Sequence, residues 1–151
     1  MPEMRVRIRR SRRTDFTAVM QLLAASGTPV PPPDRATLRR FRNLVADLGA
    51  DFYLASVDGA LAGLVHVTYA RQLAAFPAAR VEQLVVAPSF RRRGIGSTLL
   101  RFAQQRARQH GCAALSSTPL DGTSAARQFL EHGGLTAQGT CFVQGLEDGG
   151  R

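Results

Sequence analysis

One stretch of this sequence joins a strand signal to a helix signal through a basic loop with two glycines. Residues 81–86 (VEQLVV) are rich in β-branched and aliphatic side chains, which favour a buried strand. Residues 91–96 (RRRGIG) follow, and apolar residues at helical spacing continue to about His110. Glycine allows a ligand to approach the backbone closely, and the free N–H groups at a helix start attract anions. The sequence therefore predicts a phosphate-binding turn between a strand and a helix.

Two common phosphate-binding motifs do not fit this loop. A P-loop requires a lysine after its last glycine, and the sequence contains only arginine among its 20 Lys and Arg positions. A dinucleotide-binding fingerprint requires a third glycine, but Leu99 stands three residues after Gly96. The loop also follows several earlier elements, whereas that fingerprint belongs to the first strand. Both nucleotide-binding classes are therefore excluded.

The rest of the chain alternates helix and strand signals in one mixed α/β domain of residues 1–146, followed by a frayed tail at 147–151. The Asp58-Gly59 pair suits a tight hairpin turn, and residues 73–80 are expected to form a loop. The predicted element order is βααβββαβαβ. Its strands are Met4–Arg10, Phe52–Val57, Leu61–Tyr69, Val81–Val86, Cys112–Ser117 and Thr140–Gln144, and its helices are Thr14–Ala25, Asp34–Leu48, the segment ending near His110, and Asp121–Glu131.

Net charge and cysteine content limit the classes of partner and the cellular compartment, but they do not identify a function. The net charge of +9 suits either nucleic acid or an anionic cofactor. No aromatic platform accompanies the arginine runs at 5–13 and 39–42, so we expect solvated basic faces there rather than nucleic-acid contacts. Cys112 and Cys141 have no spacing typical of zinc or of a disulfide framework, which favours the cytoplasm. No apolar run is long enough to cross a membrane.

Residues 86–99 (VAPSFRRRGIGSTL) match V-x-P-x-[FY]-R-x-x-G-x-G-x-x-L, which resembles motif A of the GCN5-related N-acetyltransferases, the GNAT family. The resemblance extends to the element order of nearly the whole chain. It implies a mostly antiparallel central sheet that splays between its fourth and fifth strands. It also implies acetyl-CoA as cosubstrate, a primary amine as acceptor and no metal.

The resemblance assigns expected roles to particular residues. The strand before the loop would bind pantetheine through its backbone, and the Val86 N–H would stabilise the oxyanion formed at the thioester. A second helical motif of the family is matched in part by residues 123–135. The expected cofactor-binding residues are Leu84, Val85, Val86, Arg91, Arg92, Arg93, Gly94, Ile95, Gly96, Ser97, Thr98, Thr123, Ala126 and Phe129.

The catalytic groups are less completely matched. Glu82 stands where some members carry a general base, although it also fits a solvated or salt-bridged strand residue. Leu130 replaces the tyrosine that commonly protonates the departing thiolate, and nearby His132 is a weaker candidate for that role. We expect His66 to face solvent or the acceptor cleft. Tyr53 and Tyr69 do not correspond to any position in the motifs of the family.

Three functions remain open. The first is an N-acetyltransferase acting on a small amine or a peptide, with acceptor walls at residues 28–35, 70–80 and 137–144. The second, suggested by Leu130, is a non-catalytic module that binds CoA or a partner. The third is an arginine-rich nucleic-acid binder. A homodimer is compatible with the exposed edges of such a sheet.

Overall fold

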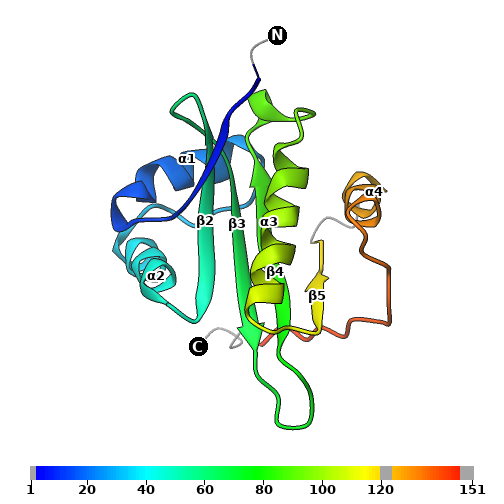
Figure 1. Cartoon of the computed structure of the whole chain (residues 1–151). Helices are drawn as coiled ribbons and strands as arrows, with labels where there is room; N and C mark the ends of the chain where they lie inside the picture. The colour runs from blue at the N-terminus through cyan, green and yellow to red at the C-terminus, as the bar shows by residue number, and fades with distance from the viewer. Residues whose placement is uncertain (1–2, 120–123, 147–151) are drawn as a thin grey trace.

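A five-stranded sheet in the order β1-β2-β3-β4-β5 is the framework of the computed structural model, which describes residues 3–119 and 124–146. Four α-helices and two short 3-10 helices accompany it in these residues (Figure 1). The elements are β1 (Val6–Arg10), η1 (Arg13–Asp15), α1 (Phe16–Ala25), α2 (Arg35–Ala46), β2 (Ala50–Val57), β3 (Ala60–Ala70), β4 (Ala78–Val86), η2 (Pro88–Phe90), α3 (Ile95–Gln109), β5 (Ala114–Ser117) and α4 (Ser124–His132).

The sheet is antiparallel except at its last pair. β4 and β5 run parallel, and their register extends only from Ala78↔Ala114 to Val81↔Ser117. Beyond Val81, β4 stays paired with β3 but has no strand on its other side within the described residues. The predicted splay between the fourth and fifth strands is therefore confirmed.

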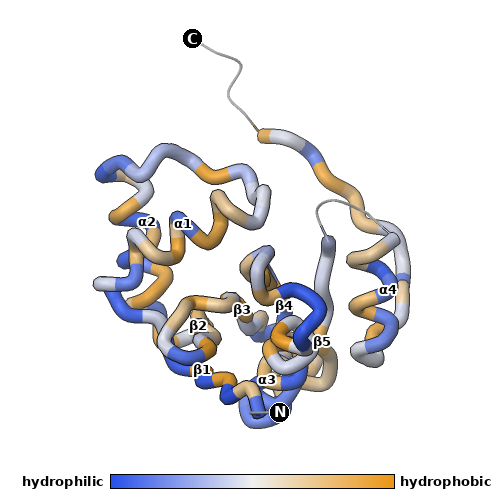
Figure 2. The backbone as a smooth tube through the Cα atoms, turned by 90° about the horizontal axis from the view of Figure 1, so that it is seen from above, coloured by the Kyte–Doolittle hydropathy of each residue, from blue (hydrophilic) through white to orange (hydrophobic). Residues whose placement is uncertain are grey.

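Helices cover the two faces of the sheet in separate layers, as the view from above shows (Figure 2). On one face, Ile95 and Leu99 of α3 pack against Val65 and Val67. On the other face, α1 and α2 contribute Val19, Leu22 and Phe41, which pack against Phe52, Leu54 and Leu64. Since neighbouring strand residues point to opposite faces, β3 supplies both cores, and its almost continuously buried pattern follows from that position.

The predicted final strand at Thr140–Gln144 is wrong. The described chain has no regular structure beyond α4, and Phe142 and Val143 are 93% and 88% exposed. β-propensity measures how well a side chain fits a paired, half-buried surface. Without a neighbouring strand, that preference does not produce a strand. The observed order over the described residues is βααβββαβα.

Other boundaries differ in smaller ways. The expected loop at 73–80 ends earlier, because Ala78 already pairs with both Ala70 and Ala114. Thr14 does not cap the first helix; it lies in η1, and the N–H of Arg12 donates to Asp15 Oδ2 at 2.6 Å. The expected helix at 121–131 is observed from Ser124 to His132, and residues 121–123 lie outside the described residues.

Candidate active site

The splay between β4 and β5 opens at Glu82, where β4 also contains a bulge. His66 pairs with Gln83 and Val67 pairs with Val81, so Glu82 has no partner in the ladder with β3. A bulge re-aims side chains and commonly lies beside a functional site. From Glu82 to Val86, the β4 edge that faces β5 has no strand partner among the described residues. Leu84, Val85 and Val86 therefore present a backbone edge to which an extended ligand can be added.

The loop after β4 turns sharply before α3 begins. The N–H groups of Phe90 and Arg91 donate to Ala87 O and Pro88 O at 2.9 and 3.3 Å and close the η2 turn. Two residues then adopt left-handed conformations, Arg92 at φ 62° and Gly94 at φ 79°. Such a conformation suits glycine, whereas arginine is strained in it, and strained backbone gathers at binding sites.

The start of α3 offers a row of unused hydrogen-bond donors. Within the described residues, no acceptor is found for the backbone N–H groups from Arg92 to Ser97; the next one, of Thr98, donates to Gly94 O at 3.0 Å. The hydroxyl of Thr98 also donates to Gly94 O, at 2.9 Å. Free N–H groups combined with the helix dipole form an anion site. Gly94, Ile95, Gly96 and Ser97 all belong to this row.

Exposed arginines surround this turn. Arg91 Nη2 donates to Ser26 O at 3.3 Å, which joins the loop to the end of α1. The guanidinium of Arg93 lies over the Phe90 ring at 5.7 Å. Arg91, Arg92 and Arg93 form no ion pair within the described part of the chain. They are therefore available to charge-assisted hydrogen bonds with phosphate oxygens.

Helix α4 closes the site from the side of β5. Phe129 lies over the first turn of α3, where a Cβ added to Gly96 would be 3.2 Å from Phe129 Cε2 and 3.6 Å from Val86 Cγ2. Gln104 Nε2 donates to Gly133 O at 2.9 Å and fixes the end of α4 to α3. Ala126 lies on the same helix, whereas Thr123 lies outside the described residues. Phe129, Gly96 and Val86 thus meet where the splay reaches the loop.

Glu82 lies at the mouth of the splay with its side chain 36% exposed. Thr68 Oγ1 donates to Glu82 Oε1 at 2.8 Å, and Arg80 Nε lies 3.5 Å from the same oxygen. Glu82 is thus salt-bridged, which agrees with one of its two interpretations, and it stands where the β4 edge becomes free. Its role as a general base stays a prediction.

His66 is buried, which corrects the expectation that it faces solvent. It is 8% exposed, its ring lies 5.3 Å from that of Phe52, and its Nε2 has no hydrogen-bond partner among the residues that the structure describes. Burial lowers the pKa of His66, against the opposing charges of Glu82 and Asp47. A neutral imidazole therefore lies beneath the α1 and α2 layer.

The remaining aromatic and proton-bearing candidates lie away from the splay. Tyr53 packs on Phe102 at 4.7 Å, and Tyr69 stacks on His110 at 3.9 Å, both in the core beneath α3. His132 Nδ1 is 2.7 Å from the carbonyl oxygen of Gln128 on its own helix. Leu130 lines a groove of about 820 Å³ between α4, β5 and residues 134–141.

Sequence reasoning missed a charged cluster beneath the far end of α3. Asp51 is 2% exposed and accepts from Arg106 Nε and Nη2 at 2.9 and 3.1 Å. The hydroxyl of Tyr69 and Nη1 of Arg10 also donate to it. Burial raises the pKa of Asp51, but the hydrogen bonds from Arg106 and Tyr69 outweigh it and leave the pKa lowered. No local pattern predicts these contacts, because Asp51 and Arg106 are 55 residues apart.

Two further searches cover the described residues. None of their helices is long and apolar enough to cross a membrane. They contain no group of three or more histidine, cysteine, aspartate or glutamate residues that could hold a metal ion.

Comparison with known proteins places the chain among acetyltransferases. A family model described as "Acetyltransferase (GNAT) family" matches residues 16–134. No curated protein sequence matches significantly.

Solved structures show the same fold at low sequence identity. Glucosamine-6-phosphate N-acetyltransferase from Arabidopsis thaliana is 17% identical, with a TM-score of 0.81 over 95% of this chain and 99% of that one. Ribosomal-protein-alanine N-acetyltransferase from Brucella melitensis biovar Abortus 2308 is 22% identical, with a TM-score of 0.78 over 95% and 100%. AAC(6')-Iy, solved with the bisubstrate analogue CoA-S-monomethyl-acetylneamine, is 19% identical, with a TM-score of 0.78 over 93% and 98%.

Proposed function

Because the chain belongs to the GNAT family of N-acetyltransferases, we propose that it transfers the acetyl group of acetyl-CoA to a primary amine of a small molecule or peptide. The observation that carries the proposal is the row of free N–H groups from Arg92 to Ser97, next to the unpaired edge of β4. Pyrophosphate needs donors, and an extended pantetheine needs a strand edge. Both are present and adjacent.

Each part of the cosubstrate has proposed partners. The pyrophosphate is bound by the free backbone N–H groups from Arg92 to Ser97, with the side chains of Arg91, Arg92 and Arg93 adding charge. The pantetheine arm lies along the backbones of Leu84, Val85 and Val86. Phe129 and Ala126 of α4 close the far side. The contact of Phe129 with the first turn of α3 supports this placement.

The proposed reaction is direct attack of the amine on the thioester. A protonated amine has no lone pair, so a base must first remove a proton, and we assign this step to Glu82, directly or through water. The nitrogen then forms a bond to the carbonyl carbon, and the Val86 N–H stabilises the oxyanion formed there. The carbon–sulfur bond breaks next, and the nitrogen loses its second proton to solvent, which leaves a neutral amide. The departing thiolate takes a proton from solvent, because Leu130 has none to donate.

A non-catalytic CoA-binding module is the second candidate, and Leu130 is the observation that favours it. The two candidates differ in turnover. Purified protein is mixed with acetyl-CoA and a panel of amines that includes aminoglycosides, amino sugars and peptides with free N-termini, and released thiol is measured. Calorimetry with CoA runs in parallel. Binding without thiol release on any amine indicates the module, and absence of CoA binding contradicts both candidates.

The assignment of Glu82 is tested on the best amine of the panel. Glu82→Gln keeps the size of the side chain but cannot take a proton. We expect kcat to fall by about a hundredfold at neutral pH, a typical loss for a general base. The loss shrinks as pH approaches the pKa of the amine, while the Kd for CoA stays unchanged. Glu131→Gln, an exposed acid paired with Arg127, is the matched control. Full turnover of Glu82→Gln at every pH would mean that another group is the base.

A further inference from the structure

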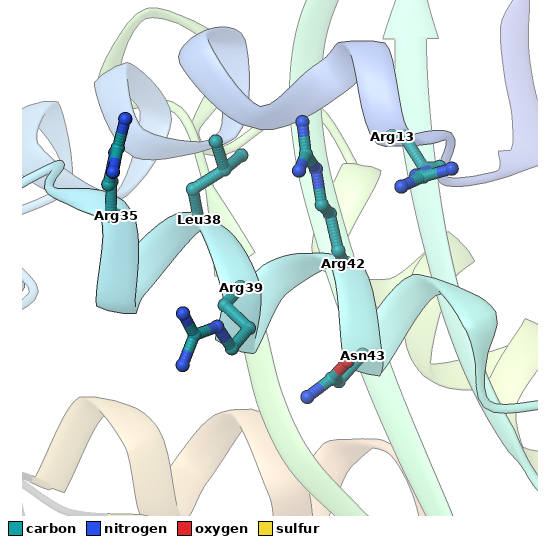
Figure 3. A pocket seen from close by; sticks show the side chains of 6 residues that line it. All are labelled: Arg13, Arg35, Leu38, Arg39, Arg42 and Asn43. Carbon is teal, nitrogen blue, oxygen red and sulfur yellow. The ribbon is translucent and has the colours of Figure 1, made fainter.

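A second concentration of positive charge lies between α2 and η1. There, four arginines line a pocket of about 330 Å³ together with Leu38 and Asn43 (Figure 3). Arg35, Leu38 and Arg42 project from one side of α2 toward α1 and η1, and Arg39 and Asn43 project from an adjacent side. Arg13 reaches the same pocket from η1. None of these residues belongs to the loop at the start of α3.

Helical spacing gathers these arginines on one surface of α2. Arg39 and Arg42 follow Arg35 by four and seven residues, which brings the three side chains to neighbouring positions on the helix surface. Thr37 and Phe41 form the buried side of the same helix. Because that side packs on the sheet, the arginine side faces outward beside η1, where Arg13 is added from a distant part of the sequence.

Among the described residues, no acidic side chain pairs with the arginines of the pocket. Arg13, Arg35, Arg39 and Arg42 are exposed and form no ion pair within residues 3–119 and 124–146. The two nearest acids in sequence are already engaged. Asp15 pairs with Arg9 at 2.8 Å, and Asp34 accepts from the N–H of Thr37 at 2.9 Å.

We propose that this pocket is a second anion site, which binds an oligophosphate. Guanidinium groups match phosphate oxygens in two-pronged geometry. Arg35 and Arg42 stand about 10 Å apart along the helix, by a rise of 1.5 Å per residue, and Arg13 adds a further guanidinium from η1. A ligand with several phosphates can therefore bind more of these guanidinium groups at once than a single phosphate can.

The oligophosphate can be free in solution or part of a nucleic-acid backbone, since both present phosphates in series. The site differs from the acetyl-CoA loop in its donors, because its lining consists of side chains of α2 and η1. This inference therefore stands independently of the proposed enzymatic activity, and saturating CoA should leave it free.

The test is calorimetry of the full chain with inorganic tripolyphosphate in the presence of saturating CoA. We expect one equivalent to bind with a submillimolar Kd. The double variant Arg13→Gln/Arg42→Gln should weaken binding by about tenfold or more, the loss expected for two charge-assisted hydrogen bonds. Arg40→Gln/Arg101→Gln removes the same charge from exposed positions outside the pocket, one of them on α2, and should leave the Kd within about twofold by the same arithmetic.

Four results would overturn the proposal: no binding at millimolar tripolyphosphate, equal weakening in both double variants, displacement of tripolyphosphate by the first equivalent of CoA, or equally tight binding of a hexaglutamate peptide. A 12-nucleotide oligouridylate then identifies the source. Tighter binding than tripolyphosphate, with a steep salt dependence lost in Arg13→Gln/Arg42→Gln, assigns the site to a nucleic-acid backbone. Weaker binding assigns it to a free oligophosphate. Circular dichroism checks that the exposed substitutions leave the fold intact.

Discussion

At its C-terminal end, α3 directs Arg106 and His110 toward the buried carboxylate of Asp51. At its N-terminal end, the N–H groups from Arg92 to Ser97 have no acceptor in the described part of the chain. One end is saturated with protein partners, and the other leaves its donors to solvent or a ligand. Buried polar groups in proteins are nearly always paired. The contrast indicates that the C-terminal end fixes the helix on the sheet, and that the N-terminal end is kept for binding.

The largest expected effect lies at the saturated end. Asp51→Ala removes the acceptor shared by Arg106, Tyr69 and Arg10, and so removes the carboxylate partner of a partly buried cluster. We expect the free energy of unfolding to fall by about 4 kcal/mol, the usual cost of breaking a buried ion pair. Urea denaturation measures it. Glu131→Ala, which breaks an exposed pair, should cost less than about 1 kcal/mol.

The comparison between the two ends of α3 requires that Asp51→Ala leave the loop at Arg92 to Ser97 undisturbed. In the folded fraction, its Kd for CoA should stay within about threefold of the wild-type value, because sites that share no partner act independently. A loss of affinity beyond about tenfold, or 1.4 kcal/mol, would show that the two ends are coupled.

The next effect concerns how closely the N-terminal half of α3 approaches the sheet. A Cβ on Gly63 would lie 2.7 Å from Val85 O and 3.0 Å from Leu99 Cδ1. Because the first of these atoms is backbone, Gly63→Val should cost about 3 kcal/mol, the upper range for overpacking. Thermal or urea unfolding measures this. Gly145→Val is the control, since no atom of the described residues lies within 4 Å of its added Cβ. Equal stability of the two variants would contradict the packing argument.

A smaller effect separates the two ends directly. Gly94 and Gly111 flank α3 at φ 79° and 72°, and both have open space around an added Cβ. Valine at either position should cost about 1–2 kcal/mol of stability through left-handed strain. Only Gly94→Val should also weaken CoA binding, by about tenfold, because relaxation of the loop misaligns its N–H groups. Equal CoA affinities of the two variants would refute the role of the loop.

The smallest effect is the acid sensitivity of the saturated end. The hydrogen bonds of Asp51 lower its folded pKa, so its contribution to stability is present above the unfolded pKa, near 3.9, and is lost as pH falls through the folded value. Asn cannot titrate, so the stability of Asp51→Asn should fall less steeply below pH 4 than that of the wild type. The two slopes should differ by the equivalent of at most one bound proton. Urea midpoints from pH 5 to pH 2.5 measure the slope. Parallel curves for the two proteins would mean that Asp51 does not titrate in this range.

The strand, loop and helix from Val81 to Gln109 could be predicted from sequence because their determinants are contiguous. The strand run, the arginines, the glycines and the helical stripe all act on their immediate neighbours. The failure at Thr140–Gln144 has the opposite cause. Its residues favour a strand, but whether a strand forms depends on a partner edge, and that edge lies elsewhere in the chain.

The sequence by itself determined the family motif, the free donors at the start of α3 and the position of Glu82 four residues before Val86, because backbone geometry over a few residues follows from local side chains. Tertiary structure alone decided three other features. It placed the bulge that frees Glu82 from the ladder, gathered Asp51, Tyr69 and Arg106 beneath the far end of α3, and brought Arg13 beside α2. These features join residues far apart in the chain, and only packing of the layers against one sheet sets the distances between them.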